Sequence, residues 1–81
     1  MKIKYFAWIK DITNSEEEEL NSTEITDLDK FKNFITTKYP ELKKHLDKEV
    51  IRFAVNQEYV VKNIDLKHND EIAIFPPVSG G

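Results

Sequence analysis

Alternating apolar and polar positions at the start of the chain predict a β-strand over residues 2–9, KIKYFAWI. One face of this strand suits a protein core, and it carries Ile3, Tyr5, Ala7 and Ile9. The other face combines a charged residue, Lys4, with two large aromatic residues, Phe6 and Trp8. Core packing does not account for these two rings, which makes them candidates for a surface function.

The next segment is polar and rich in turn-forming residues. Residues 11–15 are predicted to form a loop, and residues 18–22 to return as an edge strand in which only Leu20 marks a buried side. Four successive glutamates at 16–19 are interpreted as a solvated loop or the start of that strand, since runs of like charge are usually exposed. Charge on an edge strand discourages pairing with other chains.

Apolar residues then recur at helical spacing, which predicts a helix over residues 26–40. The predicted buried stripe consists of Leu28, Phe31, Phe34, Ile35 and Tyr39. Thr26 is predicted as the N-cap. Pro40 is predicted to end the helix, because it disfavours helical geometry at the residue before it. It also fits the opening of a second short turn, with Leu42 and Leu46 on one side.

The second half of the chain returns to strand patterns. Residues 50–56, VIRFAVN, are predicted to form a strand, residues 56–58 a turn, and residues 59–61 a short return strand. The last strand is predicted at 71–75, EIAIF, with its two isoleucines inward. The predicted inward residues of the strand at 50–56 are Ile51, Phe53 and Val55.

The order strand, strand, helix, strand, short strand, strand is that of an α+β protein with the β-grasp, or ubiquitin-like, fold. A mixed sheet of four to five strands is expected to pack on one main helix, with the first and last strands side by side in its centre. Residues 1–75 are thus predicted to form a single β-grasp domain, and residues 76–81 a flexible C-terminal tail.

Composition excludes several classes of function. The chain has 81 residues and a formal net charge of −3, which favours neither a nucleic-acid nor an anionic-membrane partner. It contains no cysteine, which excludes disulfides, thiolate metal sites and a cysteine nucleophile. No metal-ligand pattern surrounds His45 or His68, so no metal site is predicted. No signal-peptide pattern or long apolar run is present, so the protein is expected to be cytoplasmic.

The tail, FPPVSGG, holds the only two glycines of the chain, Gly80 and Gly81. Pro76 and Pro77 lack an amide hydrogen and are predicted to stop the last strand. They favour an extended path that carries the tail roughly 20 Å from the sheet. Val78 offers one apolar anchor, and the glycines, which have no side chain, suit a narrow slot.

The only reactive group predicted in this tail is the α-carboxylate of Gly81. A carboxylate is a poor acyl donor until its oxygen becomes a leaving group, which ATP achieves through an acyl-adenylate. Ser79 has no neighbouring base, so the chemistry is assigned to partner enzymes and the chain is predicted to be a substrate or carrier. Without cysteine, carried sulfur would have to sit on the C-terminus as a thiocarboxylate.

Three segments resemble the MoaD family of ubiquitin-like sulfur carriers, the small subunits of molybdopterin synthase. NDEIAIFPPVSGG, at 69–81, resembles the family's C-terminus and is the most specific of the three. IKYFAWIKDIT resembles its first strand, and FAVNQEYV resembles its AVN strand and turn.

The resemblance implies that an E1-like adenylating enzyme (MoeB-like) uses ATP to adenylate Gly81, and that a sulfur donor converts it to a thiocarboxylate. The chain then docks on the large subunit of molybdopterin synthase (MoaE-like), in a heterotetramer. Its tail delivers sulfur to cyclic pyranopterin monophosphate (precursor Z), forming the molybdopterin dithiolene. The chain would bind no cofactor and would not be an enzyme on its own. The inserted tail would consist of Pro76, Pro77, Val78, Ser79 and Gly80.

The predicted docking surface for these partners is an exposed apolar patch. Phe6 and Trp8 point away from the predicted core, and so does Phe75 on the neighbouring strand. Arg52 and Lys4 are predicted at its rim. Exposed apolar patches of this kind usually mark binding sites.

Other functions share the same ending. A carrier for thiamin synthesis or tRNA thiolation, or a modifier of the small archaeal type that joins Gly81 to lysines of other proteins, fits the Gly-Gly terminus. A plain β-grasp binding module with no terminal chemistry is a different class of function.

Overall fold

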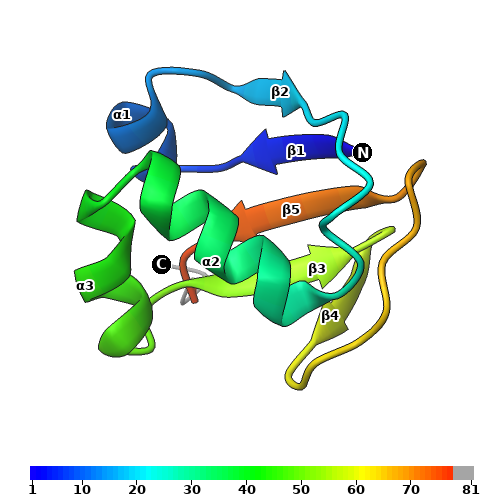
Figure 1. Cartoon of the computed structure of the whole chain (residues 1–81). Coiled ribbons are helices and arrows are strands. Elements are labelled where there is room, and N and C mark those ends of the chain that lie inside the picture. The colour runs from blue at the N-terminus through cyan, green and yellow to red at the C-terminus, as the bar shows by residue number, and fades with distance from the viewer. Residues whose placement is uncertain (78–81) are drawn as a thin grey trace.

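The computed structural model describes residues 1–77, which form one mixed five-stranded sheet in the order β2-β1-β5-β3-β4. The strands β1 and β5 pair in parallel in its interior, and the other neighbours pair antiparallel (Figure 1). Both features confirm the predicted β-grasp fold. The elements in chain order are β1 (Lys2–Tyr5), α1 (Ile9–Thr13), β2 (Glu17–Glu19), α2 (Leu28–Lys38), α3 (Glu41–Asp47), β3 (Arg52–Val55), β4 (Glu58–Val60) and β5 (Glu71–Phe75).

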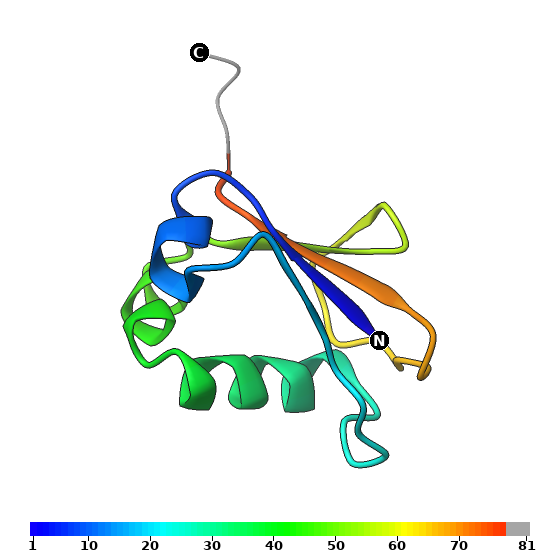
Figure 2. The same cartoon turned by 90° about the horizontal axis from the view of Figure 1, so that it is seen from above.

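Two layers result from this arrangement. Figure 2 shows α2 and α3 on one side of the sheet and no helix on the other side. The apolar stripe of α2 explains why it lies there, because Leu28, Phe31 and Ile35 are all buried against the sheet. None of the helices within residues 1–77 is long and apolar enough to cross a membrane.

The predicted strand over residues 2–9 is wrong after Tyr5. The amide of Phe6 still donates to the carbonyl of Ile74 at 3.0 Å, but Ala7 then takes a left-handed backbone angle, φ 54°. The chain turns there and α1 begins at Ile9, so part of the predicted loop at 11–15 is helical as well. Ile9 is fully buried, as predicted, although it is reached by a helical turn.

Other observed helix and strand boundaries differ from the predicted ones by a few residues. The edge strand β2 spans Glu17–Glu19 and not 18–22, although Leu20 is buried as expected. The N-cap of α2 is Asp27 and not Thr26, because the Asp27 side chain accepts from the amide of Lys30 at 2.8 Å. The helix ends at Lys38 and not at 40, although the run does stop at Pro40 as predicted, with Tyr39 as the C-cap. The second turn is the helix α3, which buries Leu42.

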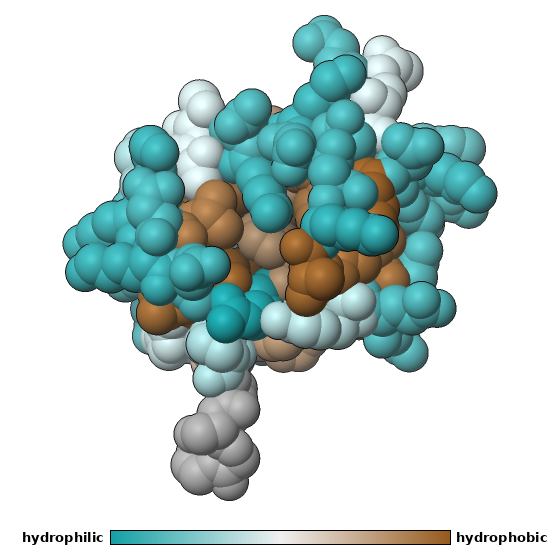
Figure 3. Space-filling view, turned by 90° about the horizontal axis from the view of Figure 1, so that it is seen from below, coloured by the Kyte–Doolittle hydropathy of each residue, from teal (hydrophilic) through white to brown (hydrophobic). Residues whose placement is uncertain are grey.

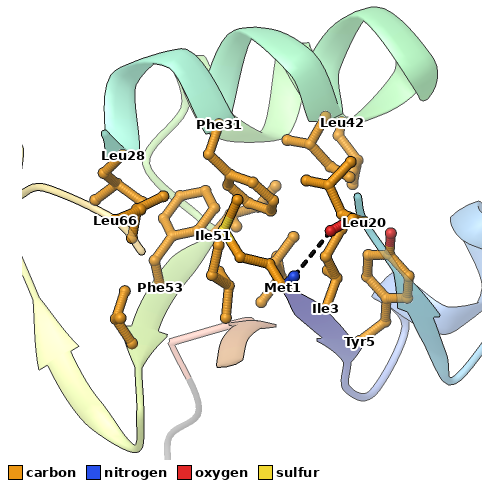
Figure 4. Packing of buried hydrophobic residues seen from close by; sticks show 14 of the residues in the cluster. Met1, Ile3, Tyr5, Leu20, Leu28, Phe31, Leu42, Ile51, Phe53 and Leu66 are labelled. Atoms are coloured by element: carbon orange, nitrogen blue, oxygen red, sulfur yellow. Dashed lines mark hydrogen bonds between the residues drawn. The ribbon is translucent and has the colours of Figure 1, made fainter. Parts of the chain in front are cut away.

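The core lies between α2 and the sheet (Figure 4). Phe31 points from α2 into its middle and meets the ring of Phe53 edge-on, with 6.3 Å between ring centroids. The predicted inward residues of β3 and β5 are all buried within this cluster. Its members are Met1, Ile3, Tyr5, Ile9, Leu20, Leu28, Phe31, Ile35, Leu42, Ile51, Phe53, Val55, Leu66, Ile72 and Ile74.

The turns of this domain are built without glycine, since both glycines of the chain lie at 80 and 81. Five other residues therefore take positive φ angles within residues 1–77, namely Ala7, Asn14, Glu49, Asn56 and Gln57. Two of them form the tight turn between β3 and β4, with φ 52° at Asn56 and 70° at Gln57. A turn of this shape favours Asn followed by Gly.

Gln57→Gly is expected to stabilise the protein by about 0.5–1 kcal/mol, because glycine reaches positive φ without the cost that a Cβ imposes. Urea unfolding at neutral pH measures the change. Asn56→Gly is the matched control and is expected to destabilise. Its side chain donates to Asp70 at 2.9 Å and accepts from the amide of Glu71 at 3.0 Å. Equal gains from both variants would contradict this explanation.

Candidate functional site

The strand that carries the tail ends where the sequence predicts. The strand β5 stops at Phe75, and of the two prolines that follow, Pro76 is buried and Pro77 is exposed. The prediction that the prolines stop the strand is thus confirmed. The remaining predicted tail residues, Val78, Ser79, Gly80 and Gly81, lie outside the described residues.

The sheet face that carries no helix is the open face, and aromatic side chains gather on it beside the end of β5. Strand pairing places Phe75 opposite Arg52 and Ala54 opposite both Ala73 and Tyr59. The rings of Tyr59 and Phe75 lie 6.3 Å apart between centroids, and Tyr59 is 56% exposed. Two alanines between larger side chains make a shallow surface that suits binding rather than catalysis.

Tyr59 was not among the predicted site residues. The sequence shows only a short strand at this point, with no indication of which side chain faces outward. The feature that could have indicated the position of Tyr59 is the turn at Asn56 and Gln57. This turn fixes the register of the hairpin so that Tyr59 lies opposite Ala54. Alternation along β3 then puts both residues on the open face.

Phe6 and Trp8 are both exposed, but they lie in different parts of the structure. Phe6 follows the buried Tyr5 at the end of β1 and is 46% exposed. Trp8 is the N-cap of α1, and its ring lies against His45 of α3 with 4.8 Å between centroids. The prediction that Trp8 shares a strand face with Phe6 is wrong, because the chain leaves the strand before it reaches Trp8.

The charged groups at the rim are held by the fold. Arg52 donates through Nη1 to the carbonyls of Glu49 at 2.5 Å and Ile51 at 3.3 Å. Lys4 lies 3.6 Å from the carboxylate of Glu71. Within residues 1–77 no group of acidic and histidine side chains is arranged to hold a metal ion. These contacts hold Arg52 and Lys4 in place at the margin of the open face.

The most perturbed titratable groups lie elsewhere, where β2 meets the end of α2. Tyr5 and Tyr39 both donate to Oε1 of Glu18, the latter at 2.6 Å, and Lys38 lies 2.8 Å from Oε2. Burial opposes the charge of Glu18, but the hydrogen bonds from Lys38, Tyr39 and Tyr5 outweigh it and lower its pKa. Burial and the neighbouring carboxylate raise the pKa of Tyr5.

This cluster makes stability depend on pH. Because the pKa of Glu18 is lower in the folded state, its contribution is complete above the ordinary value of 4.5 and is lost as the pH falls through the folded value. Glu18→Gln is expected to cost about 1–3 kcal/mol at pH 7, since it removes a charged acceptor. The difference in the free energy of unfolding between the wild type and the variant is expected to become smaller as the pH falls. Urea unfolding at a series of pH values measures it, and a gap that stays constant would contradict the assignment.

The chain is similar to one protein family and to several known proteins. The sequence model of the ThiS family matches residues 3–81. The chain is 32% identical over its full length to the molybdopterin synthase sulfur carrier subunit of Caenorhabditis briggsae, covering 96% of that protein. It is 56% identical to the protein of the same name from Dictyostelium discoideum, in a match that spans 53% of this chain and half the length of that relative.

Two solved structures share the fold over nearly the whole chain. One is a Pyrococcus furiosus protein described as molybdopterin converting factor, subunit 1, with a TM-score of 0.82, 28% identity and coverage of 95% of each chain. The other is the small archaeal modifier protein 1 of Methanosarcina acetivorans, with a TM-score of 0.77 and 28% identity. It covers 99% of this chain and 94% of that one.

Proposed function

Because this chain belongs to the ThiS family, we propose that it is the sulfur carrier subunit of a molybdopterin synthase. The observation that carries the proposal is the full-length similarity to a protein of that name, at 32% identity over the whole chain. The open face supports it, since aromatic side chains there adjoin the strand that leads into the tail. A carrier needs such a surface, because the enzymes that act on its C-terminus must bind the domain.

In the proposed reaction, the carboxylate of Gly81 attacks the α-phosphorus of ATP, forming an acyl-adenylate and releasing pyrophosphate. Sulfide (HS⁻) supplied by a donor then attacks the acyl carbon, and AMP leaves with one of the original carboxylate oxygens. The product is a thiocarboxylate on Gly81. Its sulfur bonds to cyclic pyranopterin monophosphate, and water then cleaves the acyl–sulfur bond and restores the carboxylate of Gly81. The adenylating enzyme and the large synthase subunit supply the catalytic groups, and this chain supplies the tail and the docking surface.

We assign docking to Phe6, Phe75 and Tyr59, with Arg52 at the rim. Aromatic and arginine side chains contribute most to binding at protein interfaces. Trp8 lies against α3 and is assigned to the margin of this surface. Because Pro76 is buried in the domain, the tail from Pro77 onward would enter the active site of the large subunit.

A modifier function is the second candidate, favoured by the similarity to the small archaeal modifier protein 1. It shares the adenylation step. The two functions differ in the nucleophile, which is sulfur in one case and a lysine amine of another protein in the other.

The mass of the peptide released by trypsin after Lys67, residues 68–81, tests the proposal. The protein is purified from its own cells and also loaded in vitro with ATP, a sulfur donor and an E1-like enzyme. Exchange of one oxygen for sulfur at Gly81, trapped by thiol-specific alkylation, is expected only when ATP is present. Gly81 found joined to lysines of other proteins would favour the modifier, and an unchanged carboxylate in every sample would exclude both functions.

A further inference from the structure

The two edges of the sheet differ in chemistry. At one edge, β2 reads EEE, with Glu17 and Glu18 paired to Lys2 and Lys38. At the other edge, β4 and the two residues after it read EYVVK, at 58–62. Its apolar side chains are open to solvent, with Val61 78% exposed and Tyr59 56% exposed. Three successive charges protect the first edge against pairing, whereas the second edge is charged only at its two ends, Glu58 and Lys62.

The backbone at this second edge is available for pairing. The strand β4 pairs with β3 on one side only. Within residues 1–77, no backbone hydrogen bond outside the regular helices and strands involves residues 58–62. Figure 3 views the molecule from the side on which β4 forms the margin of the sheet, and apolar surface is exposed there between charged side chains. A groove beside β4 is lined by both apolar and charged side chains, among them Leu46, Val60, Glu49 and Arg52.

This edge is complementary to itself. The strand β4 ends at Val60 and the chain bends at Lys62, so the pairing requires that residues 61–62 extend the line of β4 when a second strand binds. If two copies then run antiparallel about an axis at Val60, Tyr59 of each copy faces Val61 of the other, and Glu58 of each faces Lys62 of the other. Every such contact occurs twice around a two-fold axis. Cross-strand pairs of opposite charge and of aromatic with β-branched residues are both stabilising.

Other registers lose this match. Moving the axis by one residue, to Tyr59, sets Glu58 opposite Val60 and Lys62 opposite Asn56, so neither charge faces an opposite charge. Glu58 and Lys62 are also available in the single copy, because both are exposed and neither takes part in a salt bridge among residues 1–77.

We propose that a second copy of this chain binds along β4, with residues 58–62 of the two copies paired antiparallel about Val60. The two five-stranded sheets then form one continuous sheet. Since β3 lies between β4 and β5, this pairing does not cover the strand that leads into the tail.

Sedimentation equilibrium over micromolar to millimolar concentrations tests the proposal, and wild-type protein is expected to show a reversible monomer–dimer equilibrium. Glu58→Lys and Lys62→Glu each set like charges opposite one another at two places. Each is expected to raise the dissociation constant about tenfold or more. An equimolar mixture of these two variants is expected to form the mixed dimer with affinity near that of the wild type, because every facing pair is then of opposite charge.

Glu19→Lys is the control for the charge change of Glu58→Lys, since Glu19 is exposed on β2, at the opposite edge of the sheet from β4. It is expected to leave the dissociation constant unchanged, and thermal unfolding checks that every variant is folded. A wild-type chain that stays monomeric throughout the concentration range overturns the proposal. So does a dimer that the two single variants do not weaken, or whose affinity their mixture does not restore.

Discussion

Deleting Gly80 and Gly81 is expected to abolish sulfur loading and sulfur transfer while leaving the melting temperature unchanged. The chain then ends at Ser79, whose side chain would occupy a slot that suits residues without a Cβ. The fold should not respond, because the described core cluster ends at Ile74. Loading is measured by the mass of the C-terminal peptide, and transfer by dithiolene formation with the large subunit.

A graded variant makes this test sharper. Gly81→Ala keeps the length of the tail and adds one methyl group next to the reacting carboxyl, and it is expected to slow loading about a hundredfold through misplacement of the acyl carbon. Binding to the large subunit, measured by calorimetry, is expected to change little for this variant. If the truncated protein were loaded at the normal rate, the accepting group would have to be elsewhere in the chain.

Phe31→Ala is expected to have the largest effect on stability, lowering the free energy of unfolding by about 3–5 kcal/mol. Phe31 is 0% exposed and packs against both Phe53 and Phe34, so its removal leaves a cavity between α2 and the sheet. A domain of this size is typically stable by roughly 4–12 kcal/mol, so a large part of the total would be lost. Urea unfolding followed by circular dichroism measures it.

Phe34→Ala is the matched control for this prediction. It removes the same side chain from the same helix, but Phe34 is only partly buried at the edge of the core. Its cost is expected to be less than half that of Phe31→Ala. Equal costs would mean that the helix, and not the core beneath it, accounts for the loss.

Long periodic segments were predictable from the sequence, since their pattern and their packing agree. The alternation predicted for the strands at 50–56 and 71–75 gave the correct buried residues, because each strand has one face on a single core. Of the predicted helical stripe, Leu28, Phe31 and Ile35 are buried, whereas Phe34 and Tyr39 are only partly buried. The exposure of Phe6 was also predicted, from the alternation of apolar and polar positions in residues 2–9. These are the parts of the fold in which local preference and tertiary contacts favour the same structure.

The errors fall where a single residue decides the path of the chain. Ala7 has no intrinsic preference for a positive φ, so nothing in the sequence indicates that β1 ends before it. Thr26 and Asp27 are both good N-caps, and only the extended backbone of Asp27 (φ −152°, ψ 171°) selects it. Trp8 and Tyr59 could be assigned to a surface only once the turns that precede them were known.

The position of β5 has a consequence for the synthesis of the protein. Both β1, made first, and β3 pair with β5, which is translated last among the strands. The sheet therefore cannot close while the ribosome still holds residues 71–75, and a nascent chain interrupted before them lacks the partner of two strands. Such incomplete products would expose their apolar residues and be open to proteases. A molecule that has folded has therefore been translated through residues 71–75, which leaves only the short tail to Gly81 between the last strand and the end on which the proposed chemistry depends.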